Sequence, residues 1–432
     1  MTSPLDGAGA QARAPESFAA LRHGGFRAYF VTYALAMTAD NIEHVISYWM
    51  MFQKFQSPAL AGFAVLSHWL PFLLFSVYSG ALADRFDPRR IIQIGMLVFM
   101  GVSLAWGWFF VHDSLEIWHA MVLLVLHGFA GVLWTPSSQI LIHDIVGPAH
   151  LQSAVRLAAT ARWLGLLLGP AVGAGIMLAL GPAYGILANV LIYVPLLLWL
   201  WKAPYGPRFR KAEAAPPRAV RGLADIVQTI RDIAGDRTIV SMTLLAGGAS
   251  LLVGNAYHAQ MPEFAHDLGH GQADFTYSML LAADAAGALV AGFVLESRNL
   301  LRAKPRTAFA LAVLWCCAIA GFAAVRAYPI ALALLFVAGF LELSFNAMAQ
   351  TLVQLHAPAH VRGRVIGLFN MSALGMRAFS GVTVGLLGAL IGIHWSLALS
   401  AMTLLTAVLA LLALTSRAAP SRVAKGAPRT RA

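Results

Sequence analysis

Polar side chains interrupt the long apolar stretches of this chain at regular positions. In the stretch 27–51, Asp40, His44 and Ser47 are spaced at i, i+4 and i+7, which places them on one face of a helix. A carboxylate near an imidazole in apolar surroundings can take up and release a proton. The spacing therefore predicts a proton-binding or substrate-binding site inside a membrane.

Arg162 and Arg377 each lie near the middle of another apolar stretch. Only a protein partner or water keeps an arginine charged at such a position. We therefore expect Arg162 to pair with Asp40 or Glu43, and Arg377 to pair with Glu342. Each pair either takes part in proton coupling or simply locks the helices together. The candidate substrate and proton-coupling residues are Asp40, Asn41, Glu43, His44, Arg162, Asp284, Glu342, Asn346 and Arg377.

His44, His68 and His127 also lie in apolar stretches. A histidine there carries protons or, more often, forms a hydrogen bond to a neighbouring helix. The adjacent Cys316 and Cys317 are poorly placed to bridge each other. The chain has no HExxH motif, no Cys/His metal spacing and no GxxxxGK[ST] loop. We therefore expect no metal, no cofactor and no ATP-driven step.

The composition indicates a polytopic membrane protein. The chain has 432 residues, of which 59% are hydrophobic and 11% charged, whereas soluble domains have about 25% charged residues. The net charge of +11 does not indicate nucleic-acid binding, because the basic residues lie in short loops between apolar stretches.

A membrane-crossing helix needs about 20 apolar residues, and twelve stretches meet this length. They are 27–51, 59–80, 91–111, 117–142, 153–180, 183–202, 237–260, 275–296, 306–326, 329–353, 364–391 and 395–415. The longest polar interruption ends in an amphipathic stretch, Leu223–Ile233. The expected divisions are a tail 1–25, a first half 26–202, a linker 203–236, a second half 237–416 and a tail 417–432.

The basic residues are distributed asymmetrically across these spans. With both termini in the cytoplasm, 26 of the 30 basic residues lie on the cytoplasmic side. Lys54 and Arg326 lie on the opposite side, and Arg162 and Arg377 lie within spans. This asymmetry follows the positive-inside rule and predicts that both termini are cytoplasmic.

The loop 80–90 has the pattern G-x-L-A-D-R-x-D-x-R-R between two apolar stretches. Gly80 permits close helix approach, and Asp84 could cap the N-terminus of a helix in the other half. Arg85, Arg89 and Arg90 could pair with acids or lipid phosphates. The loop is either a latch between the halves or a plain positive-inside anchor.

A small-residue pattern, Gly165-x3-Gly169-Pro170-x2-Gly173, lies in the fifth span. Small residues at every fourth position let two helices pack closely, and Pro170 permits a kink. The pattern is either a functional motif or ordinary packing.

The two halves resemble each other at an offset of 210 residues. The segment 147–151, Gly-Pro-Ala-His-Leu, aligns with 357–361, Ala-Pro-Ala-His-Val. Gly80-x3-Asp84 also has a weaker counterpart in Gly292-x3-Glu296. An internal repeat of this kind is typical of transporters built from two six-helix halves.

These spans, the 80–90 loop, the fifth-span motif and the repeat resemble the major facilitator superfamily over about residues 20–416. The start 21–29 and the loop 144–154 resemble a branch that includes macrolide-type drug exporters and the enterobactin exporter. The resemblance implies an all-α integral membrane fold of twelve helices in two pseudo-symmetric halves. It also implies proton-driven export of a small amphiphilic molecule by alternating access, with Gly165, Gly169, Pro170 and Gly173 as an antiporter-like motif.

Two other functions remain open: an uptake symporter or lipid flippase on the same fold, and a membrane-embedded enzyme. The enzyme is disfavoured because no nucleophile elbow or metal motif is present. The expected partners are a small-molecule substrate, protons and membrane lipid, with no nucleic acid. We expect a functional monomer in a bacterial inner membrane.

Overall fold

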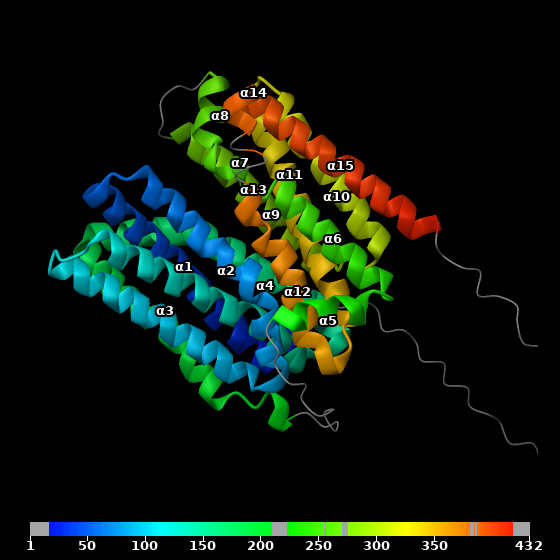
Figure 1. The fold of residues 1–432 in the computed structure, drawn as a ribbon, viewed down its shortest axis with the longest axis horizontal. Helices are drawn as coiled ribbons and strands as arrows, with labels where there is room; N and C mark the ends of the chain where they lie inside the picture. Colours follow the sequence, from blue (N-terminus) through cyan, green and yellow to red (C-terminus); the bar gives the residue numbers. More distant parts are fainter. Residues whose placement is uncertain are drawn as a thin grey trace, which may run out of the picture.

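The computed structural model describes residues 17–209, 223–254, 256–269, 275–380, 384 and 387–417. The expected tails 1–25 and 417–432, and the linker 203–236, therefore lie partly outside the described residues. The described residues are almost entirely helical and form two bundles that lie side by side, with the blue-to-green first half beside the light-green-to-red second half (Figure 1).

The first half contains α1 (Gly24–Phe55), α2 (Pro58–Arg85), α3 (Pro88–Val111) and α4 (Ile117–Lys202). Within α4, Gly147 and Gly181 have φ values of +69° and +75° and are not helical. A side chain is strained at such angles, so glycine permits the chain to reverse there. The range of α4 therefore holds three consecutive helices, which correspond to the expected fourth, fifth and sixth spans.

The linker contributes the helix α5 (Leu223–Ile233), which has the amphipathic character expected from the sequence. The second half contains α6 (Arg237–Leu252), α7 (Ala256–Ala259), α8 (Met261–Asp267), α9 (Phe275–Ser297), α10 (Pro305–Ala324), α11 (Tyr328–His356), α12 (Arg362–Asn370), α13 (Arg377–Ser380), α14 (Leu387–Ile391) and α15 (Ile393–Arg417). A π-helical turn, Met371–Gly375, separates α12 from α13. Such turns frequently occur at functional sites.

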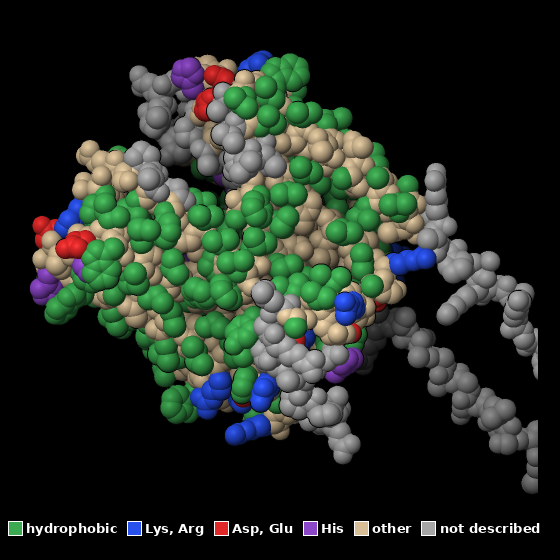
Figure 2. All heavy atoms as spheres, in the orientation of Figure 1, with side chains coloured by type: hydrophobic (Ala, Val, Ile, Leu, Met, Phe, Trp, Pro, Cys, Tyr) green, Lys and Arg blue, Asp and Glu red, His purple; other side chains and the backbone are tan. Residues whose placement is uncertain are grey.

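Among the described residues, seven helical segments are long and apolar enough to cross a membrane, and one of them, Ile117–Phe209, covers three expected spans. The expected spans outside these segments are α1, which carries charged residues, α6 to α8, and the interrupted α12 to α14. Apolar side chains cover much of the bundle surface, and Lys and Arg gather along its lower edge (Figure 2). The chain is a multi-pass membrane protein.

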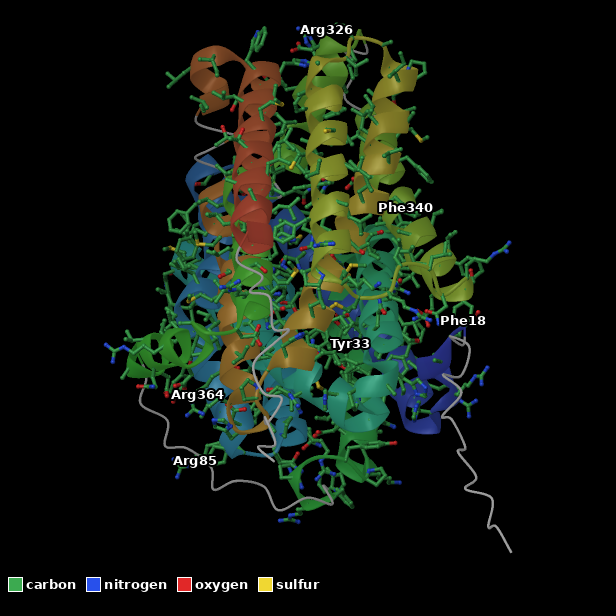
Figure 3. The ribbon with its side chains drawn as sticks, turned by 90° about the vertical axis from the view of Figure 1, so that its right-hand side faces the viewer. Phe18, Tyr33, Arg85, Arg326, Phe340 and Arg364 are labelled. Atoms are coloured by element: carbon green, nitrogen blue, oxygen red, sulfur yellow. The ribbon has the colours of Figure 1, made fainter. Side chains whose placement is uncertain are left out.

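The two ends of the bundle carry different basic residues. Arg85 and Arg364 lie at one end, and Arg326 lies at the other (Figure 3). This placement agrees with the expected assignment of Arg326 to the side opposite the 80–90 loop. The end that carries Arg85 and Arg364 is called the latch end below.

Candidate functional site

A cavity of about 430 Å³ lies between the two halves. Its first-half lining includes Asp40, Asn41, His44 and Arg162, and its second-half lining includes Glu342, Asn346 and Arg377. Seven of the nine predicted substrate and proton-coupling residues therefore line one space. Glu43 and Asp284 lie just behind its wall, where they contact histidines that line it.

In the first half, His127 contacts both acids of α1. Its Nε2 lies 3.0 Å from Oδ1 of Asp40, and its Nδ1 lies 2.8 Å from Oε1 of Glu43. The other oxygen of Glu43 accepts a hydrogen bond from the Ser103 hydroxyl. Glu43 and His127 are both buried, so this contact satisfies polar groups that are costly to bury alone.

The predicted pairing of Arg162 with Asp40 or Glu43 is wrong. Among the described residues, Arg162 has no carboxylate within 4 Å and lies exposed in the cavity. The reason is the register between helices: Gly165 packs on Met37 and Gly169 on Asn41. This register puts Arg162 near the level of Tyr33, about six residues or 9 Å along the helix from Asp40.

In the second half, the predicted pair of Arg377 and Glu342 is present, with Nη2 3.8 Å from Oε1. Tyr257 Oη lies 3.5 Å from Oε2 of Glu342 and 3.4 Å from Oδ2 of Asp284. The same oxygen of Asp284 lies 2.9 Å from Nε2 of His258. The second half therefore has its own cluster of two acids with cationic and hydroxyl partners.

Arg377 also connects the halves across the cavity, because its guanidinium lies 5.1 Å from the ring centre of Trp69. Trp69 belongs to α2, and Arg377 begins α13 two residues after the last residue of the π-helical turn. A cation over an indole face is attracted by the ring quadrupole. The interrupted span thus directs its arginine toward the first half.

At the latch end, Asp84 caps the N-terminus of α12, as the loop pattern predicts. Its Oδ1 accepts from the amide of Gly363 at 2.5 Å, and its Oδ2 accepts from the amide of Arg364 at 3.1 Å. Gly80 and Gly363 face each other so closely that a Cβ on either would overlap the other's carbonyl. Free amides at a helix N-terminus favour a carboxylate.

The Arg364 side chain adds a second connection at the latch end. Its Nη1 lies 3.2 Å from Oδ2 of Asp84, and its Nε lies 3.0 Å from Oδ1 of Asp225 in α5. Arg364 is 1% exposed. The linker helix is therefore tied to the contact between the two halves.

The weaker sequence repeat corresponds to a related contact. Glu296 of α9 accepts from the Ser153 hydroxyl and lies 3.9 Å from Nη1 of Arg156. Arg156 also donates to the carbonyls of Leu295, Leu300 and Leu301 at 3.0, 2.5 and 2.5 Å. The Asp84 and Glu296 contacts are related by the repeat. In each, an acid four residues after a glycine in one half contacts the start of the fifth span of the other half.

The arginines of the 80–90 loop have local partners within the first half. Arg89 pairs with Asp87 at 2.6 Å, and Arg90 donates to Gln93 at 2.8 Å. Arg85 is exposed beside Phe86. Asp87 caps α3 through the amide of Arg89, so the Asp-Pro pair in the loop starts the next helix.

The fifth-span motif packs directly on α1. A Cβ at Gly165 would lie 2.9 Å from the backbone of Met37, and one at Gly169 would overlap the side chain of Asn41. A Cβ at Gly173 would lie 3.5 Å from Cα of Ile42. Pro170 lies inside the same helix. The motif fixes the position of the α1 residues that line the cavity.

The sequence did not indicate several of these partners. They are Ser103, Arg364, Asp225, Tyr257 and His258. His127 stood out as a histidine in an apolar stretch, but its pairing with two acids depends on the rotation of α4 against α1. Arg364 stood out only as one of many basic residues near a membrane face.

The Major Facilitator Superfamily model matches residues 29–381. The chain belongs to this superfamily. A segment of 164 residues is also 27% identical to the uncharacterized MFS-type transporter YfiS of Bacillus subtilis strain 168. That match covers 35% of this chain and 37% of YfiS, so the chain spans well under half of this relative in the comparison.

Solved major facilitators share the fold at low identity. The human organic anion transporter MFSD10 (TETRAN) matches with a TM-score of 0.69 and 15% identity, covering 90% of this chain and 99% of that one. The E. coli fucose:proton symporter FucP matches with a TM-score of 0.71 and 11% identity, covering 92% and 99%. A second FucP structure, in the outward conformation, has the same TM-score. These likenesses establish the fold, and the chain is a transporter of this superfamily.

Proposed function

We propose that this major facilitator exports a small amphiphilic molecule in exchange for protons by alternating access. The observation that supports the proposal is a charged cavity between two halves whose described charged contacts concentrate at the latch end. Hydrogen bonds to an aspartate can break and re-form as that end opens and closes. The cavity then faces each side of the membrane in turn.

The acids behind and along the cavity wall support proton coupling. Asp40 contacts His127, and Asp284 contacts His258. A carboxylate beside an imidazole within a membrane can exchange a proton with water that enters the cavity. We propose that Asp40, with Glu43 or Glu342, carries the coupled proton.

The cavity lining supports the proposed substrate class. Trp69, Phe72 and Trp134 supply apolar surface, while Arg162 and Asp40 supply opposite charges. This combination suits an amphiphilic molecule with a polar or charged group. One chain supplies the whole cavity, so we propose that a monomer suffices.

The proposed location is a bacterial inner membrane with the latch end in the cytoplasm. The distribution of Lys and Arg supports this orientation. The packing of Gly165 and Gly169 on α1 supports export because it resembles the antiporter motif. A proton symporter on the same fold is the second candidate, favoured by the likeness to FucP.

Proteoliposomes that enclose the pH dye pyranine test the proposal, with ethidium and anilinonaphthalene sulfonate as the transported probes. We expect an imposed pH gradient to drive at least one probe against its own gradient, with protons moving the opposite way. Asp40→Asn should abolish this coupling in a protein that still folds. Asp113→Asn is the control, since Asp113 is exposed and pairs with Lys54 far from the cavity.

Coupled efflux at the wild-type rate in Asp40→Asn would contradict the role of Asp40. Movement of probe and protons in the same direction would establish the symporter instead. Size-exclusion chromatography of each purified variant shows whether a loss of transport reflects misfolding.

A further inference from the structure

Three histidines from three different helical spans meet at the first-half wall of the cavity. His44, His68 and His127 each present one ring nitrogen, and these nitrogens all lie within 4.8 Å of one another. The ring centres of His44 and His127 are 4.5 Å apart, and those of His44 and His68 are 5.0 Å apart. No sequence spacing indicates this group, because the residues are brought together only by the fold.

The hydrogen bond of His44 to a backbone carbonyl fixes which of its ring nitrogens carries the hydrogen. Its Nδ1 lies 2.7 Å from the backbone carbonyl of Asp40. A carbonyl only accepts, so Nδ1 carries the hydrogen and Nε2 keeps its lone pair. That Nε2 lies 3.3 Å from Nδ1 of His68.

His127 likewise forms a hydrogen bond through its Nδ1, in this case to a carboxylate. Its Nδ1 donates to Oε1 of Glu43 at 2.8 Å, and Glu43 is itself bound by Ser103. Its Nε2 is buried and lies 3.0 Å from Oδ1 of Asp40. A histidine that ligates a metal usually donates its other N–H to a carboxylate or carbonyl in this manner.

The spacing of these atoms fits a tetrahedral ion. With metal–nitrogen bonds of about 2.0–2.1 Å, two ligand atoms of a tetrahedral zinc lie about 3.3 Å apart. The measured separations are 3.3 Å between His44 and His68 and 3.0 Å between His127 and Asp40. The ligand nitrogens of the three histidines all lie within 4.8 Å of one another, so binding of the ion would require the rings to rotate toward it.

The charge of the cluster also fits a dication. Asp40 and Glu43 are both acids, and among the described residues neither has a Lys or Arg nitrogen within 4 Å. Acids within a membrane require a compensating charge. Two carboxylates, three neutral imidazoles and one divalent ion sum to zero charge.

We propose that His44, His68, His127 and Asp40 bind one divalent transition-metal ion of the zinc type, with Glu43 orienting His127. The 430 Å³ cavity gives the ion a path to the site. A second space of about 10 Å³, lined by Glu43 and the three histidines, adjoins the cluster. This proposal departs from the sequence expectation of no metal, and it does not rest on the direction of transport. Because a metal-bound carboxylate is deprotonated, the ion and the proposed coupled proton are alternative occupants of Asp40.

Metal binding to the purified, tag-free full-length protein tests the proposal without any transport assay. We expect one Co²⁺ per chain, with the intense visible absorption of tetrahedral coordination, and displacement of Co²⁺ by Zn²⁺ but not by Mg²⁺. X-ray absorption at the zinc edge of the wild-type protein should show four nitrogen or oxygen ligands, three of them imidazole. This measurement requires no variant and therefore no assumption about folding.

Variants then assign the site. His68→Gln and His127→Gln should each weaken Zn²⁺ binding by more than about tenfold, and Glu43→Gln should weaken it by about 10- to 100-fold. His258→Gln is the matched control, since His258 also pairs with an acid, Asp284, in the second half. Six-coordinate zinc with oxygen ligands, or equal affinity in His127→Gln and the wild type, would overturn the proposal.

Discussion

Asp84 accepts two hydrogen bonds from Arg364, one from the backbone amide at 3.1 Å and one from Nη1 at 3.2 Å. The two residues belong to different halves, and their side chains are 7% and 1% exposed. A buried ion pair contributes little net stability, because desolvation offsets the attraction, but loss of one partner is costly. This contact therefore suits a latch that holds one conformation and dissociates when both groups become hydrated.

Asp84→Asn should weaken the closed state of the latch end. The amide removes the charge that Arg364 and the α12 amides require, at a cost of about 1–3 kcal/mol. We expect a shift of population toward conformations open at this end. In a cysteine-free background, spin labels at Lys202→Cys and Arg302→Cys, both exposed and in different halves, should report a longer distance.

Asp87→Asn is the control for this variant. Asp87 caps α3 and pairs with Arg89, all within the first half. Its replacement should leave the label distance unchanged. An unchanged distance in Asp84→Asn would mean that this contact does not set the conformational balance.

Asp225→Asn should loosen the linker helix. Asp225 is buried and lies 3.0 Å from Nε of Arg364, so its neutralisation weakens the attachment of α5. Hydrogen exchange measured by mass spectrometry should become faster across Leu223–Ile233. Asp232→Asn, at an exposed position of the same helix, should leave the exchange near the wild-type rate. Equal protection in both variants would argue that apolar packing alone holds α5.

Gly169→Ala should destabilise the first half. A Cβ at this position would overlap the side chain of Asn41, and overpacking typically costs about 1–3 kcal/mol. Thermal unfolding in detergent should show a lower Tm. Gly175→Ala is the matched change, because no atom lies within 4 Å of its added Cβ. We expect it to be neutral or stabilising through helix propensity. A Tm for Gly169→Ala equal to that of Gly175→Ala would refute the close packing.

Acid should weaken the attachment of the N-terminal segment. His23 precedes α1, and its Nε2 lies 2.8 Å from Nδ1 of His150. Burial, and then the neighbouring His150, lower the pKa of His23 below 6.5. Its contribution to stability is therefore present above pH 6.5 and is lost as the pH falls below that value.

The measurement is the Tm of the wild type and of His23→Gln at pH 7.5 and at pH 5.5. Glutamine cannot be protonated, so the Tm of the variant should fall less on acidification. Identical pH dependence in the two proteins would show that other groups dominate.

Several features could be predicted from the sequence because each depends on the type and depth of particular residues. The twelve spans follow from the length of the apolar stretches, and the cap formed by Asp84 follows from an acid at the end of one of them. The close helix packing at Gly169 follows from the absence of a side chain, although the sequence did not identify α1 as the neighbour. The pair of Glu342 and Arg377 follows from two opposite charges at similar depth.

The register and rotation of neighbouring helices were decided only by the tertiary structure. They leave Arg162 in the cavity, and they place Asp40 and Glu43 against His127 rather than against Arg162. They also bring His44, His68 and His127 together and join Arg364 to Asp225. The sequence determined the spans and the depth of each charged residue, because hydrophobicity acts along the chain. The partners of Asp40, Glu43 and Arg364 depended on side-chain packing between helices far apart in the sequence.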